Sequence, residues 1–183
     1  MTSTAYKTVF SDYHHGPTSF IHMLSKPIAP TRDVAIYQDD TDKLKEATVK
    51  SAKKINTKLV FFGDHTADKA MELNQLAYQT KQSVCFIDCQ LLVDKYIGET
   101  EKHLSKLIAQ AESQSWILFF EKAEVLFSRC TEVKDEHHEY ANQDVSYIVK
   151  RLYQYPSLSI LSLTEKHNLE IIQYAVDNII SFR

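Results

Sequence analysis

Glycine is scarce in this chain of 183 residues, where only Gly16, Gly63 and Gly98 occur. Glycine is the residue that turns with a positive φ and close backbone approaches need most. The few positions that keep it are therefore more informative than usual. Gly63 and Gly98 both lie inside the motifs described below.

Cysteine is also scarce, and Cys85, Cys89 and Cys130 make an odd number. The first two lie on or beside an apolar run, so we expect buried, reduced thiols and no disulfide framework. No apolar stretch approaches the roughly 20 residues that span a bilayer. The N-terminus lacks the basic start and apolar run of a signal peptide. These absences predict a cytoplasmic protein without a membrane partner.

The chain has no large excess of either charge, since 21 basic residues face 24 acidic ones for a net charge of -3. That balance argues against a general nucleic-acid binder. The lysine-rich segment 41–55 also contains acidic residues that interrupt its field. We interpret it as a solvated helix that precedes the core and could contact a neighbouring subunit.

Short apolar runs alternate with helical patterns over most of the chain. Strands are expected at Leu59–Phe62, Val84–Ile87, Ile117–Phe120, Leu158–Leu163 and Ile179–Phe182. The segments between them carry apolar residues at helical spacing. Alternating strands and helices form parallel sheets covered on both faces. The predicted fold is an α/β three-layer sandwich with a five-stranded, mostly parallel sheet of the P-loop NTPase type.

The first 40 residues show no sustained period and contain three of the four prolines. We predict an irregular N-terminal arm over residues 1–40, with a short helical turn around Phe20–Leu24. Residues 41–183 are predicted to form one core domain together with the leading helix.

The segment after the first core strand resembles a damaged phosphate-binding loop. An intact loop has the pattern G-x-x-x-x-G-K-[ST], in which backbone N–H groups hold phosphates, the lysine reaches the outer phosphates and the hydroxyl holds Mg²⁺. Gly63 and Lys69 keep the spacing, whereas Asp68 replaces the second glycine and Ala70 the hydroxyl residue. The candidate nucleotide-binding residues are Gly63, Asp64, His65, Thr66, Ala67, Asp68, Lys69 and Ala70.

A second site shows similar damage, where the apolar run Ile117–Phe120 ends in Glu121 and Lys122. In an intact site the first of two acids helps to hold Mg²⁺ and the second activates water. A lysine cannot act as that base at neutral pH unless its pKa falls by several units. No catalytic residue is therefore assigned with certainty, although Glu121 and Lys122 occupy the two acid positions.

Taken in order, these motifs resemble the large subdomain of an AAA-family ATPase over residues 55–182. The segment Leu91–Lys102 is similar to the part of the family that leads through the first pore loop, which places Tyr96, Ile97 and Gly98 in a pore-loop position. The segment Glu132–Asn142 is most similar to AAA proteins encoded with phage-tail-like contractile particles. The resemblance implies ATP, Mg²⁺ and protein partners.

The departures from the family pattern are equally specific. The resemblance places Thr164 at the position of the polar sensor, where the family has asparagine. The stretch 175–178 contains no arginine, where the family carries its arginine fingers. The sequence also ends at Arg183, where the family continues into a helical lid. With the altered loop glycine, hydroxyl and base, these changes indicate a degenerate member, or pseudoenzyme.

The loop 63–70 has two readings: it still binds nucleotide, or it is only the turn from a strand to a helix. Asp64 and Asp68 would both face the phosphates, and each pair of charges about 5 Å apart costs roughly 3 kcal/mol at an effective dielectric constant of about 20. Asp68 also suits the first turn of the following helix. We predict that Asp68 substitutes for the phosphate and pairs with Lys69 or Lys122.

Two further segments have structural alternatives. Tyr96 and Gly98 either grip a peptide, as in the family, or form a glycine-terminated turn with Tyr96 packed on the surface. Adjacent histidines such as His137 and His138, or His14 and His15, project in different directions from a helix, so no metal site is predicted.

Two functions remain open from the sequence. The first is a binding or scaffold protein that associates with itself or with a protein partner, and has weak or no binding of ATP, ADP and Mg²⁺. The second is a divergent ATP hydrolase that uses Lys69 for the phosphates and Glu121 for the metal to remodel a protein partner.

Overall fold

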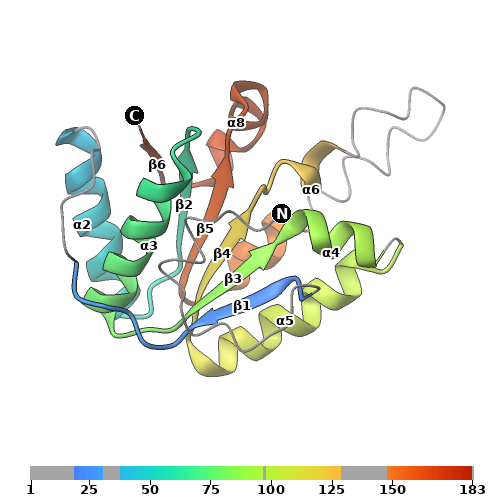
Figure 1. Ribbon diagram of the computed structural model, residues 1–183, viewed down its shortest axis with the longest axis horizontal. Helices are drawn as coiled ribbons and strands as arrows, with labels where there is room; N and C mark the ends of the chain where they lie inside the picture. The colour runs from blue at the N-terminus through green and yellow to red at the C-terminus, as the bar shows by residue number, and fades with distance from the viewer. Residues whose placement is uncertain (1–18, 31–37, 97, 129–147, 183) are drawn as a thin grey trace.

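The computed structural model describes residues 19–30, 38–96, 98–128 and 148–182, and these form one sheet with helices on both faces (Figure 1). The six strands lie in the order β1-β3-β4-β5-β2-β6. Their bounds are β1 Ile21–Leu24, β2 Thr57–Phe62, β3 Val84–Asp88, β4 Ile117–Glu121, β5 Leu158–Leu163 and β6 Asn178–Ser181. The five strands β2 to β6 pair in parallel, which confirms the predicted fold class.

The sixth strand corrects the sequence prediction. Ile21–Leu24 is a strand that pairs antiparallel with β3 in the register Ile21 to Ile87, and it is not a helical turn. Four residues beside prolines carry too short a pattern to separate a helix from a strand. The edge of β3 supplies the hydrogen-bonding partners that decide between them.

The helices cover the two faces of the sheet separately (Figure 1). One face packs against α2 (Gln38–Ala52) and α3 (Thr66–Thr80). The opposite face packs against α4 (Cys89–Lys95), α5 (Thr100–Gln114), α6 (Val125–Ser128), the helical residues 148–154 and α8 (Lys166–Ile172). A 3₁₀ turn, η1 (Gln173–Ala175), leads into β6. Each strand alternates its side chains between these two cores, as a pleated strand must.

The buried thiols illustrate this alternation. Cys85 lies on β3 and Cys89 begins α4, and both are free and fully buried. Burial raises the pKa of the Cys85 thiol to about 12, so it stays neutral. Among the described helices, none is both long and apolar enough to cross a membrane.

Candidate functional site

The loop after β2 is held against the ends of two other strands. The N–H of Gly63 donates to the carbonyl oxygen of Leu163, at the end of β5, over 3.1 Å. Gly63 has a φ of +121°, and a Cβ at this position would lie 2.7 Å from the backbone oxygen of Phe182. The glycine is therefore required by close packing of the chain itself, because both the dihedral angle and the neighbour exclude a side chain.

Lys69 extends from the first turn of α3 into the protein and is only 2% exposed. Its Nζ donates to the Ser162 Oγ over 3.0 Å and to the Leu163 carbonyl oxygen over 3.2 Å. Both acceptors belong to β5, so the lysine connects α3 to the end of this strand. The cation that would meet the outer phosphates in an intact loop makes internal hydrogen bonds here.

Burial also changes the proton affinity of this lysine. Loss of hydration lowers the pKa of Lys69 to about 8, and the nearby carboxylates of Glu121, Glu124 and Asp64 partly oppose that shift. A buried cation is tolerated when such charges and hydrogen bonds compensate it. Lys69 thus lies at the centre of an acidic group built from the ends of β2 and β4 and the turn after β4.

The other altered positions of the loop have structural surroundings. Ala70 is fully buried in the core between α3 and the sheet, so this position carries packing where an intact loop carries a hydroxyl. Asp68 lies in the first turn of α3, as the sequence indicated, with its Oδ2 3.7 Å from the His65 Nδ1. Its predicted pairing with Lys69 or Lys122 stays a prediction.

The end of β4 carries Glu121 and then Lys122, whose φ of +52° turns the chain away from the strand. Three residues after Glu121, the Glu124 Oε1 accepts a hydrogen bond of 2.9 Å from the Thr164 hydroxyl. The predicted sensor residue is thus joined to a carboxylate that the sequence analysis did not select. A third acidic position after the strand was the available signal, but only the turn at Lys122 brings Glu124 to the end of β5.

The predicted pore-loop tyrosine is packed on neighbouring aromatic rings. The Tyr96 ring stacks on His103 with centroids 3.6 Å apart and meets Phe20 edge to face at 5.5 Å. Gly98 follows with a φ of +79° and leads into α5. This arrangement matches the packed alternative, while a role in gripping peptide stays a prediction. Ile97, Cys130, the two histidine pairs and the segment Glu132–Asn142 lie outside the described residues.

Together, the parallel strand order and the loop between β2 and α3 define a three-layer α/β domain of the P-loop NTPase type. Residues 59–159 match the ATPase family associated with various cellular activities (AAA). This match covers more than half of the chain, and the chain belongs to the AAA family. No curated protein matches the sequence.

Solved structures with a similar fold include two of the FIGL-1 AAA domain. The complex of that domain with ADP superposes with a TM-score of 0.64 at 18% identity, covering 87% of this chain and 57% of the other. A second structure of the FIGL-1 AAA domain gives a TM-score of 0.65 at 18% identity, covering 98% of this chain and 61% of the other. At this identity the likeness concerns the fold, and the chain spans about three fifths of those domains.

Replacing Lys69 with methionine is expected to remove a pH dependence of stability. Because folding lowers the pKa of this ammonium from 10.5 to about 8, the native state releases its proton above pH 8 while the unfolded state still holds it. The free energy of unfolding should therefore rise with pH, by about 2 kcal/mol between pH 8 and 9.5. Urea unfolding of wild type and Lys69→Met at both values measures the loss of this rise.

The matched control is Lys106→Met, because Lys106 is an exposed lysine of α5. This variant should keep the rise in stability of the wild type. If Lys69→Met and wild type respond equally to pH, Lys69 remains charged in the native state throughout this interval.

Proposed function

We propose that this chain is a degenerate AAA domain that acts as a binding or assembly protein, with weak or no binding of nucleotide. The observation that carries the proposal is the internal position of Lys69. Its ammonium is buried and bonded to Ser162 and Leu163, and it would have to leave both acceptors to reach a phosphate. The leaving step exposes two acceptors and costs the hydrogen bonds that satisfy them.

The retained Gly63 supports the same conclusion. Its contact with the Phe182 carbonyl and its bond to Leu163 account for a glycine at this position without any phosphate. The two positions that preserve the phosphate-loop pattern, Gly63 and Lys69, therefore both have structural functions. Their retention in the sequence does not require nucleotide binding.

The charges around the loop act against nucleotide as well. Asp64, Glu121 and Glu124 are all close enough to influence Lys69, and a polyphosphate would add negative charge to this group. Ala70 offers no hydroxyl for Mg²⁺, and Lys122 offers no base for water. The residues present therefore do not fit a nucleotide–Mg²⁺ complex, and at these two positions they lack the metal ligand and the base that hydrolysis needs.

Calorimetric titration of the whole chain with ADP and with ATP, each with Mg²⁺, tests the proposal. We expect no detectable binding at millimolar nucleotide. Nucleotide at 100 times its Kd would add about 2.7 kcal/mol to the stability, so thermal unfolding gives an independent measurement. Binding in the micromolar range would contradict the proposal.

The alternative is a divergent ATP hydrolase, which is favoured by the two carboxylates Glu121 and Glu124 near Lys69. Only this function predicts release of phosphate from ATP. It would further require that Lys69→Ala abolishes turnover in a variant whose unfolding transition shows that it is folded. A protein partner or self-association belongs to both functions, and analytical ultracentrifugation with and without nucleotide would measure the second.

A further inference from the structure

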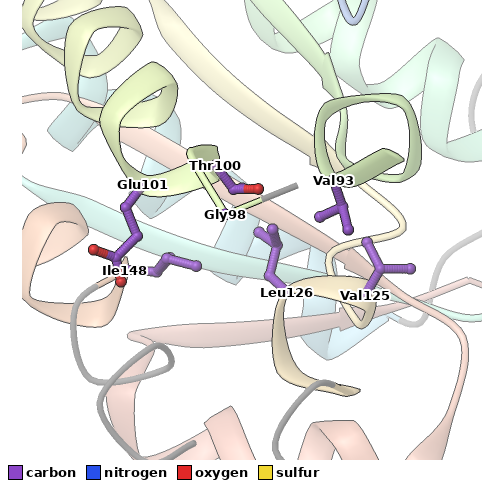
Figure 2. Close-up of a pocket in the computed structure, with 7 residues that line it drawn as sticks. All are labelled: Val93, Gly98, Thr100, Glu101, Val125, Leu126 and Ile148. Carbon is purple, nitrogen blue, oxygen red and sulfur yellow. The ribbon is translucent and has the colours of Figure 1, made fainter. Parts of the chain in front are cut away.

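A cavity of about 200 Å³ lies beside Gly98 on the face of the sheet opposite α3 (Figure 2). Its lining comes from α4, α5, α6 and the first residue of the helical segment 148–154. None of the loop residues 63–70 contributes to it. The cavity is therefore separate from the candidate nucleotide site and does not depend on the proposed function.

Most of the wall is aliphatic. Val93, Val125 and Leu126 gather on one side of the cavity, and Ile148 lies on the other beside Glu101 (Figure 2). These branched side chains come from three separate helical segments, so the cavity is built by tertiary packing. Such a wall suits the methylene stem of a long side chain, which gains by leaving water.

The two polar side chains of the lining are acceptors toward a ligand. The Thr100 hydroxyl uses its only proton in a 3.0 Å hydrogen bond to the Tyr96 carbonyl oxygen, which leaves its lone pairs for a donor. Glu101 adds a carboxylate from the next residue of α5. A group that fits here must bring hydrogen-bond donors, and a positive charge would complement Glu101.

We propose that this cavity receives the side chain of one arginine from a protein partner. A guanidinium presents several donors in a fixed plane, so it can meet the Glu101 carboxylate and the Thr100 oxygen together. Its methylene stem lies against Val93, Val125 and Leu126. The helix dipole of α5 places only about half a positive charge at this end, which is less than the full charge of Glu101.

The size of the cavity supports a single side chain. Pockets that hold drug-sized ligands measure about 300–1,000 Å³, and this one is smaller. A carboxylate beside the wall disfavours an anionic or purely aliphatic group, because burying the carboxylate without a donor is costly. An arginine at the surface of a partner satisfies both the volume and the charge.

The test uses the whole chain and a capped pentapeptide with a central arginine flanked by alanines. Titration should shift the backbone amide signals of Thr100, Glu101 and Leu126 in NMR spectra and saturate in the millimolar range. An equivalent peptide with citrulline, which has the same shape without the charge, should bind about tenfold more weakly because the charge-assisted bond is lost. Equal affinity of the two peptides would overturn the proposal.

The matched variants are Glu101→Gln and Glu112→Gln. Both residues are exposed on α5, and Glu112 lies three turns away from the cavity. Glu101→Gln should weaken arginine-peptide binding about tenfold, whereas Glu112→Gln should leave it unchanged. Absence of shifts at the cavity, or an unchanged affinity in a folded Glu101→Gln variant, would overturn the proposal.

Discussion

Replacing Gly63 with alanine is expected to lower the free energy of unfolding by about 4 kcal/mol. The φ of +121° is strained for a residue with a side chain, at a cost of about 1–3 kcal/mol. The added Cβ would also lie 2.7 Å from the Phe182 carbonyl oxygen, and such overpacking costs about 1–3 kcal/mol. Urea unfolding at neutral pH measures the sum.

Gly98→Ala is the control for this prediction. Gly98 also has a positive φ, of +79°, but a Cβ there meets no described atom within 4 Å. Alanine at this position should therefore cost only the backbone strain, roughly 1–2 kcal/mol. If both variants lose the same stability, the contact between the loop and Phe182 contributes nothing, and the structural explanation for the retained Gly63 fails.

Replacing Glu72 with glutamine is expected to stabilise the protein by about 3 kcal/mol at pH 8. Glu72 lies on α3 and is only 4% exposed, and burial raises the pKa of its carboxyl from 4.5 to about 7. Between these values the native state keeps its proton while the unfolded state has lost it. Stability therefore falls as pH rises from 4.5 to 7, and the loss is complete above pH 7.

Glutamine resembles the protonated carboxyl in shape and does not ionise, so the variant should lack this fall. Thermal unfolding at pH 8 should show a melting temperature roughly 8 °C higher than that of wild type, since 1 kcal/mol shifts it by about 2–4 °C at this size. At pH 4 the two proteins should unfold at nearly the same temperature. Glu170→Gln, at an exposed position of α8, should change neither value.

The core of the fold was predictable because strand and helix periods are local. Leu158–Leu163 was predicted with the bounds that the structure has, and the other parallel strands differ by at most two residues at either end. The edge strand β1 was missed since four residues give no reliable period. The seven-residue helices α4 and α8 were also not predicted.

The candidate site was predictable in position but not in arrangement. Spacing alone placed Gly63 and Lys69 at the end of a strand, and the structure puts them there. Spacing could not show that the lysine bends toward β5, because Ser162 is 93 residues away in the sequence. Glu124 escaped selection for a similar reason, since its partner Thr164 lies 40 residues further on.

The sequence by itself determined the alternation of strands and helices, the membership of the AAA family and the loss of the usual groups at Asp68, Ala70 and Lys122. Each of these depends on residue types at short, fixed spacing. Only the tertiary structure decided that the ammonium of Lys69 is internally bonded and that Gly63 is required by Phe182. Those facts depend on which strand ends meet, and contacts between distant segments form only when the whole sheet is assembled.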